Sequence, residues 1–226
     1  MKRRNPHKKK IILGITGSFG SGKTTVARIF KSFGAKIIDA DKLAHGCITS
    51  RSPAYEKIIH TFGNGILKNN RIIDRRKLAV IVFNNINLLI KLNNIIHPQV
   101  IQIIKNKINS AKSKVTVLDA PLLIESGLVK LVDKLIVVKI NRAKQIKRIQ
   151  NKTSLTKTDI LKRIKSQISQ NVKLRLADFV IDNSGMIKET RRQVENICKN
   201  MNLSLAGKKK YSPARDQFAR RKVRAH

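Results

Sequence analysis

Residues 11–33 read IILGITGSFGSGKTTVARIFKSF, a short apolar run followed by a glycine-rich turn and a helical pattern. Within this stretch, residues 17–24 (GSFGSGKT) fit the pattern G-x-x-x-x-G-K-[ST]. Glycines let such a loop wrap a phosphate so that its backbone N–H groups point inward, and the next helix adds the positive end of its dipole. The flanking strand and helix patterns favour a nucleotide-binding P-loop over a glycine-rich turn without a ligand.

In a loop of this kind the lysine reaches the β- and γ-phosphates, and the hydroxyl that follows can be a ligand of Mg²⁺. Those residues are Lys23 and Thr24. We predict that the nucleotide is bound by Gly17, Ser18, Phe19, Gly20, Ser21, Gly22, Lys23, Thr24 and Thr25.

The composition favours a globular α/β domain with inserted segments over two independent domains. The chain has 226 residues, of which 41% are hydrophobic and 4% aromatic, so its core is expected to consist mostly of Ile, Leu and Val. Its two cysteines, Cys47 and Cys198, have no metal-site or disulfide-framework spacing. No apolar run approaches the ~20 residues of a membrane span, and no signal peptide is evident. We therefore expect a cytoplasmic protein without a membrane partner.

The chain is strongly basic, because it has 49 Lys and Arg residues against 13 Asp and Glu residues and a formal net charge of +36. Such a charge often indicates nucleic-acid binding, but that function usually concentrates the charge on one face or in one run. Here 35 basic and 12 acidic residues are spread over the body between the two basic ends. Because Lys, Asn and Ile are enriched together, we attribute the charge to a coding bias and expect no specific nucleic-acid partner. A selected polyanion-binding surface is the alternative.

Five short apolar runs are expected to be strands, and helices separate them. This alternation predicts a parallel sheet with right-handed crossovers, so the predicted fold class is α/β, a P-loop NTPase fold with a five-stranded parallel sheet. The predicted strands are residues 11–15, 36–39, 115–119, 135–138 and 179–182.

The segment between the second and third strands, residues 43–112, is too long for a loop and is expected to be an inserted helical subdomain. Asp74 is expected to cap one of its helices, and His97-Pro98 to begin another.

Residues 142–169 are polar and basic. Thr156 and Asp159 resemble a capping box, and the helix that follows is predicted to bury one stripe of side chains. That stripe consists of Ile160, Ile164, Ile168, Val172 and Leu176.

Several polar residues follow the carboxyl ends of predicted strands. They are Asp39, Asp41, Asp119, Asp182 and Asn183. Ligands of open α/β sheets bind along that edge, so we expect these residues and the P-loop to line one cleft.

The ordered set of motifs resembles the dephospho-CoA kinase family over residues 11–199. Besides the P-loop, the resemblance rests on IDAD at 38–41, His97-Pro98, DAPLLIE at 119–125, RIKSQ at 163–167 and ADFVIDNSG at 177–185. It implies transfer of the ATP γ-phosphoryl group to the 3′-hydroxyl of dephospho-CoA, with ATP and Mg²⁺ as cofactors and dephospho-CoA as the small-molecule partner. We expect a monomer or a weak homo-oligomer.

The resemblance also implies a division of the chain into parts. A nucleotide-binding core would comprise residues 11–42, 113–141 and 170–200, with a helical substrate-binding subdomain at 43–112 and a lid at 142–169. Outside these parts lie a basic N-terminal arm (1–10) and a basic tail (201–226) that we expect to be disordered.

Site residues are transferred from the matching motifs. Asp41 is the candidate base, with Lys23 and Arg148 as the other catalytic residues, and Asn183 as a further nucleotide contact. The metal site would comprise Thr24 and Asp119, and dephospho-CoA would be bound by Asp39, His97, Pro121, Leu122 and Arg163.

Each assignment has a structural alternative. Asp39 and Asp41 could cap the following helix, and His97 could be an ordinary histidine at a helix start. Pro121 and Leu122 are expected to be packing residues or pocket wall, and the arginines could lie on a solvated helix face. One departure concerns the lid, because Lys152 stands where a second arginine is often found and cannot bind phosphate in two-pronged fashion.

Two other functions stay open at this point. A nucleoside monophosphate kinase would share the sheet and the lid, and the acceptor preference separates it from a dephospho-CoA kinase. A basic nucleic-acid-binding protein on a P-loop fold would show salt-dependent RNA affinity and no phosphorylation of an acceptor.

Overall fold

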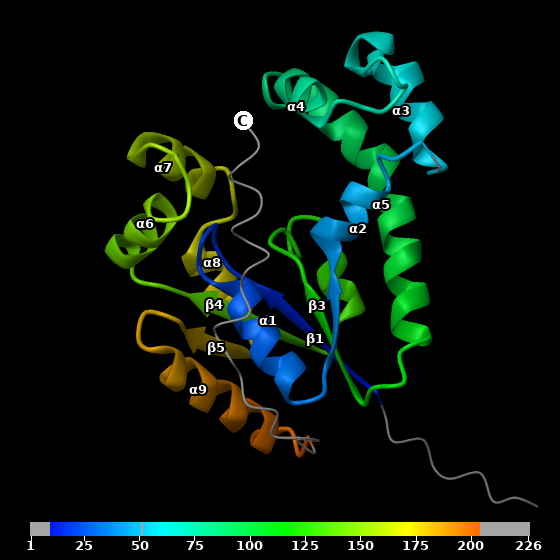
Figure 1. The fold of residues 1–226 in the computed structure, drawn as a ribbon. Helices are drawn as coiled ribbons and strands as arrows, with labels where there is room; N and C mark the ends of the chain where they lie inside the picture. Colours follow the sequence, from blue (N-terminus) through cyan, green and yellow to red (C-terminus); the bar gives the residue numbers. More distant parts are fainter. Residues whose placement is uncertain (1–9, 51, 204–226) are drawn as a thin grey trace, which may run out of the picture.

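The computed structural model describes residues 10–50 and 52–203, so residues 1–9 of the predicted arm and 204–226 of the predicted tail lie outside it. Within the described part, five parallel strands form one sheet of order β2-β3-β1-β4-β5 (Figure 1). They are β1 (Ile11–Thr16), β2 (Lys36–Asp39), β3 (Val115–Asp119), β4 (Lys134–Lys139) and β5 (Phe179–Asp182). The predicted α/β class and five-stranded parallel sheet are confirmed.

Helices cover both faces of the sheet. Successive side chains of a strand point to opposite faces, so each buried strand contributes side chains to both cores. In β4, Ile136 and Val138 pack with the buried faces of α1 (Lys23–Ser32) and α9 (Ile187–Asn200). Leu135 and Val137 belong to the second core cluster, on the face covered by α5 (Ile86–Asn109). The near-continuous apolar character of the strands therefore reflects burial on two sides.

The segment between β2 and β3 is helical, as predicted. It comprises α2 (Ala40–Gly46), α3 (Ala54–Phe62), a 3₁₀ turn η1 (Asn64–Ile66), α4 (Arg75–Phe83) and α5. Asp74 caps α4 by accepting hydrogen bonds from the N–H groups of Arg76 and Lys77, at 2.9 and 3.4 Å. Figure 1 shows α3 and α4 beyond the sheet edge, with the C-terminal part of α5 alongside the sheet. Ile58 of α3 and Ile104 of α5 share one core cluster with Leu118 of β3, so one continuous core joins these helices to the sheet.

The prediction that a helix begins at His97-Pro98 is wrong. Both residues lie inside α5, which begins at Ile86 with Asn85 as its N-cap. Proline in a helix interior removes one backbone hydrogen bond, but it does not end the helix here. The buried side chains of Ile96 and Val100, on either side of it, anchor both halves of α5 in the same core.

The predicted stripe of five residues is also wrong in its second half. The helix that begins after the Thr156–Asp159 capping box, α7 (Lys157–Lys165), buries Ile160 and Ile164 and then ends. Ser169 caps a new helix, α8 (Gln170–Arg175), and the break changes the face that turns inward. As a result Val172 and Leu176 are 43% and 54% exposed.

Helix α6 (Arg142–Gln150) packs with α7 around a small core of its own. That core consists of Ile149, Ile160 and Ile164, with Phe19, Ile146 and Leu155 packed against it. A 3₁₀ turn, η2 (Leu128–Leu131), precedes β4. No helix in residues 10–50 and 52–203 is long and apolar enough to cross a membrane.

Ile104 provides a test of the shared core, because its side chain is fully buried in α5 against the sheet. We expect Ile104→Ala to lower the free energy of unfolding by about 2–5 kcal/mol, the usual cost of such a cavity. Ile86→Ala is the control, because Ile86 lies in the same helix and is 66% exposed, and a change within about 0.5 kcal/mol is expected. Equal losses in urea unfolding of the two variants would contradict the assigned core.

Candidate active site

The P-loop connects β1 to α1, so that backbone N–H groups of the loop and of the first turn of α1 are left without helical partners. Gly22 is the N-cap of α1 and has φ 92°, a conformation that side chains with a Cβ rarely adopt. A Cβ atom there would lie 1.9 Å from Nδ2 of Asn183. Both the backbone angle and the close neighbour therefore require glycine at this position.

Lys23 is the first residue of α1, and its side chain is only 8% exposed. Its Nζ donates hydrogen bonds to the carbonyl oxygens of Gly17 and Ser18, at 3.0 and 3.2 Å. Burial lowers the pKa of Lys23 to about 8, against the attraction of Asp119 and Asp41. The loop thus contains a partly desolvated ammonium group.

A pocket of about 300 Å³ opens beside this lysine at the carboxyl edge of the sheet. Its charged and hydroxyl-bearing lining includes Lys23, Thr24, Asp39, Asp41, Lys42 and Asp119. His45 and Pro121 complete the lining. The expected convergence of the P-loop with the acids that follow β2 and β3 is therefore present, whereas Asp182 and Asn183, which follow β5, lie outside this lining.

Asp119 ends β3 and lies in register with Asp39 of β2 on one side and Ile15 of β1 on the other. The side chain is 8% exposed. Burial raises the pKa of Asp119 to about 6, while the positive charge of Lys23 opposes that shift. Asp119 and Lys23 are thus buried groups of opposite charge that both line the pocket and influence each other's pKa.

Asp39 and Asp41 have different local tasks. Asp39 is the N-cap of α2, since its carboxylate accepts a hydrogen bond from the N–H of Lys42 at 3.0 Å. The Nζ of Lys42 lies 3.3 Å from the same carboxylate. Asp41 lies in the first turn of α2 and faces the pocket. Desolvation by the surrounding protein raises the pKa of Asp41, and the charge of Asp39 adds to that shift.

The tip of the P-loop contacts two glutamines that the sequence analysis missed. Gln145 of α6, 1% exposed, donates to the Ser18 hydroxyl at 2.9 Å and to the Phe19 carbonyl. The side-chain amide oxygen Oε1 of Gln167 accepts from the Phe19 N–H at 2.8 Å. The Phe19 ring packs on the small core of α6 and α7. Phe19 is therefore turned toward these helices. Of the two glutamines, Gln167 is part of the RIKSQ motif, whereas Gln145 lies in no motif of the sequence analysis.

Asn183 and Arg148 support the loop that follows β5. The Asn183 side chain donates to the carbonyl of Ser21 at 2.8 Å and accepts from the Thr190 hydroxyl at 3.0 Å. Arg148 donates to the carbonyl oxygens of Asn183 and Gly185, at 2.7 and 3.4 Å. In this conformation Arg148 lies outside the lining of the pocket.

Three other predicted substrate contacts also lie outside that lining. The Arg163 guanidinium lies 5.6 Å from the centroid of the Phe19 ring, a cation–π contact. His97 is half-buried within α5, and burial lowers its pKa. Leu122, next to the pocket residue Pro121, is 47% exposed.

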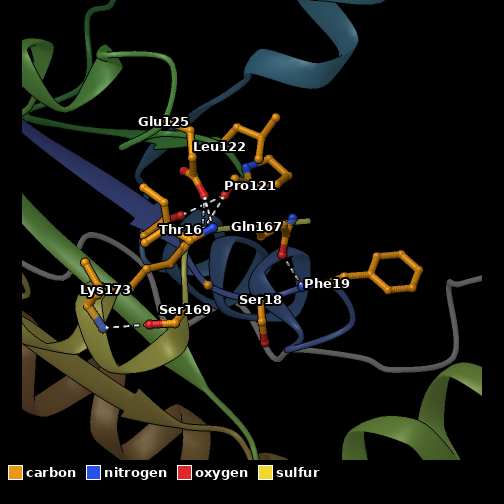
Figure 2. Close-up of polar contacts among 12 residues, drawn as sticks. Thr16, Ser18, Phe19, Pro121, Leu122, Glu125, Gln167, Ser169 and Lys173 are labelled. Atoms are coloured by element: carbon orange, nitrogen blue, oxygen red, sulfur yellow. Dashed lines mark hydrogen bonds and ion pairs between the residues drawn. The ribbon is translucent and has the colours of Figure 1, made fainter. Parts of the chain in front are cut away.

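Lys173 of α8 is a cation that the sequence analysis missed. Its side chain is fully buried, and its Nζ lies 2.8 Å from the Glu125 carboxylate and donates to the Pro121 carbonyl at 3.2 Å (Figure 2). The hydroxyl of Thr16, the last residue of β1, donates to the same carbonyl at 3.0 Å. The motif DAPLLIE contains the partners of this lysine, but the predicted apolar stripe did not include Lys173.

The residues present fit a nucleotide with Mg²⁺. Within the described ranges no group of three or more His, Cys, Asp or Glu could hold a metal ion alone. That is consistent with Mg²⁺, which usually binds one or two carboxylates together with phosphate oxygens and waters. Thr24 and Asp119 supply such oxygens in the pocket. Among the residues that the structure describes, the buried Ser21 hydroxyl finds no hydrogen-bond partner, so the loop retains a polar group that a phosphate would satisfy.

The raised pKa of Asp119 predicts how stability depends on pH. Between pH 3.8 and about 6 the folded state binds more protons at this carboxyl than the unfolded state does. Its contribution to stability therefore falls as pH rises through that window. We expect Asp119→Asn to gain about 1–3 kcal/mol relative to the wild type between about pH 4 and pH 7, measured by urea unfolding.

Asp178→Asn is the matched control of opposite sign. The hydrogen bond from Lys134 lowers the pKa of Asp178, so its stabilising effect is present at neutral pH and is lost as pH falls through the lowered pKa. This variant should lose stability relative to the wild type as pH rises. An Asp119→Asn variant whose relative stability does not increase with pH would contradict the assigned burial of that carboxylate.

Comparison with known sequences identifies the family. The model of a family described as dephospho-CoA kinase matches residues 11–189. A dephospho-CoA kinase of Carboxydothermus hydrogenoformans is 44% identical over 189 residues, which cover 82% of this chain and 92% of that protein. One of Bacillus licheniformis is 42% identical over 190 residues, covering 83% and 94%.

Solved structures agree with this result. The dephospho-CoA kinase of Campylobacter jejuni superposes with a TM-score of 0.59 at 31% identity, covering 84% of this chain and 96% of that one. The crystal structure of TT1252 from Thermus thermophilus superposes with a TM-score of 0.76 at 27% identity, covering 85% and 98%. With the P-loop, the acids at the sheet edge and the matched motifs on one scaffold, the chain belongs to the dephospho-CoA kinase family.

Proposed function

We propose that this protein transfers the γ-phosphoryl group of ATP to the 3′-hydroxyl of dephospho-CoA, producing CoA and ADP. The observation on which the proposal rests is the pocket at the carboxyl edge of the sheet, where the P-loop lysine meets three carboxylates. Phosphoryl transfer requires mainly positioning and neutralisation of charge, and these groups are suited to both. Membership of the family supplies the acceptor.

In the proposed reaction Lys23 and the loop N–H groups bind the β- and γ-phosphates. Thr24 and Asp119 would hold Mg²⁺, Asp119 through water, and the bound ion would neutralise charge on the phosphates. Phosphate oxygens would replace the carbonyls of Gly17 and Ser18 as partners of the Lys23 ammonium. The negative charge of the nucleotide would also favour the protonated form of this lysine.

Asp41 is the proposed general base. It would accept the proton of the 3′-hydroxyl while that oxygen bonds to the γ-phosphorus and the bond to the β–γ bridging oxygen breaks, so that ADP leaves. Its raised pKa brings it closer to the operating pH, which favours proton transfer. Asp39 would act as a positioning residue, because its N-cap hydrogen bond fixes the first turn of α2 in which Asp41 lies.

The remaining parts have proposed roles that the resemblance to the family implies. Residues 43–112, which include His97, would bind dephospho-CoA. Pro121 and Leu122 would contribute further contacts to this substrate. Residues 142–169 would form a lid over the nucleotide, with Arg163 as an additional cation. A catalytic role for Arg148 requires this side chain to exchange the carbonyls of residues 183 and 185 for phosphate.

The direct test supplies purified protein and Mg·ATP with dephospho-CoA, AMP, CMP or UMP in parallel, and measures ADP release and product mass. We expect CoA as the product. Turnover with a nucleoside monophosphate and none with dephospho-CoA would show that the acceptor is wrong although the fold class holds. Salt-dependent RNA binding without phosphorylation of any acceptor would favour a nucleic-acid-binding protein.

The base assignment predicts that Asp41→Asn lowers kcat/KM by about 10²–10⁴, the range associated with loss of general-base catalysis. The Kd of Mg·ATP should stay within about threefold, since Lys23 and the loop are unchanged. Asp182→Asn is the control, because this acid also follows a strand of the sheet but pairs with Lys139 at 3.3 Å, outside the pocket lining. An Asp41→Asn variant with the activity of the control would refute the assignment.

A further inference from the structure

Burial of Lys173 is costly in free energy, because a fully buried ammonium group loses its hydration. The Glu125 carboxylate at 2.8 Å and the Pro121 carbonyl at 3.2 Å offset that loss. Yet well-packed apolar residues in place of a buried ion pair often leave stability unchanged or higher. Stability alone is therefore a weak reason for this ion pair, and its other contacts indicate a different task.

The Glu125 carboxylate has a second partner. The oxygen that lies near Lys173 also accepts a hydrogen bond from the N–H of Ile168 at 3.2 Å. Ile168 lies in the short connection between α7 and α8, and its neighbour Gln167 accepts from the Phe19 N–H at 2.8 Å. The connection is thus fixed at two successive residues, one to Glu125 and the other to the P-loop (Figure 2).

The same network reaches the P-loop from its other end. The Pro121 carbonyl, which accepts from Lys173, also accepts from the hydroxyl of Thr16 at the end of β1. Lys173 also lies close enough to Lys23 for its charge to lower the pKa of that lysine. The Pro121 carbonyl therefore joins the buried pair to the residue before the nucleotide loop, while α6 and α7 contact the loop through Phe19.

We infer that the ion pair between Lys173 and Glu125 is a positioning device for nucleotide binding. Lys173 orients the Glu125 carboxylate, which fixes residues 167–168, and Gln167 then fixes the Phe19 peptide in the P-loop. None of these three side chains contacts the reacting atoms in this role. The inference rests on one part of the proposed function, the binding of ATP by the P-loop. It assigns the residues that keep this loop in its binding conformation.

The test removes both charges at once, so that no buried ion is left without its partner. Lys173→Met combined with Glu125→Leu should remain folded, with cooperative unfolding, because the replacements are apolar and similar in size. We expect the Kd of Mg·ATP, measured by calorimetry without any acceptor, to rise about tenfold, since small displacements of a binding loop have large effects. Gln167→Met alone should raise the Kd to a similar extent.

The triple variant, which combines Lys173→Met, Glu125→Leu and Gln167→Met, shows whether the ion pair and Gln167 affect the Kd of Mg·ATP through the same contact. This comparison separates positioning from a general loss of stability. If the ion pair acts through Gln167, the triple variant should bind Mg·ATP no more than about twofold more weakly than the weaker of the two parents. Independent effects would multiply instead. Multiplying effects would overturn the inference, because a loss of stability elsewhere does not depend on the side chain at position 167.

The matched control is Lys134→Met combined with Asp178→Leu. That ion pair, at 2.7 Å, also contains a carboxylate that accepts a backbone N–H, that of Leu135 at 2.8 Å. It lies where β4 begins, at the opposite end of the strand from the pocket. The Kd of Mg·ATP should stay within about twofold of the wild type, since the control removes an ion pair of the same residue classes, although a more exposed one, far from the P-loop.

Two further outcomes overturn the inference. One is a folded Lys173→Met/Glu125→Leu variant that binds Mg·ATP within about twofold of the wild type. The other is wild-type affinity in Gln167→Met, which is decisive even if the double variant does not fold. A wild-type protein that binds Mg·ATP but does not phosphorylate dephospho-CoA would refute the proposed function alone, since the binding measurement uses no acceptor.

Discussion

The structure depends on a buried ammonium group at the carboxyl edge of a parallel sheet. Lys23 is nearly inaccessible to solvent, and burial lowers its pKa to about 8. Two loop carbonyls and the nearby charge of Asp119 hold the ammonium in place in the protein alone. A site built this way favours a polyanion strongly, because phosphate oxygens compensate a charge that the protein compensates only in part.

The acids around Lys23 show the cost of this arrangement. Asp119 is placed by strand pairing between β1 and β2, and its carboxylate is so buried that its pKa rises to about 6. Asp41 is placed by α2, whose first turn is fixed by the Asp39 N-cap. Neither position is favourable for an ionised carboxylate in the free protein. Such destabilised charges are typical of sites shaped for a ligand and its metal rather than for stability.

Most of the fold could be predicted from the sequence, because five apolar runs and the glycine pattern are local signals. The pocket could be predicted for the same reason, since its acids directly follow strands. Prediction failed where tertiary packing overrides local signals, at Pro98 within a long buried helix and at the break between α7 and α8. The roles of Gln145 and Lys173 were missed because partners far away in the chain determine them. The site roles transferred from the family remain predictions.

The titration of Lys23 itself is the most direct test of the buried ammonium group. Heteronuclear NMR can follow the ε-methylene group of Lys23 from about pH 6 to pH 11, with the resonance assigned by a Lys23→Arg variant. The account predicts a midpoint near pH 8 in the free protein and a clear increase when Mg·ATP binds. A midpoint at the ordinary value of 10.5 in the free protein would contradict the buried ammonium on which the site is built.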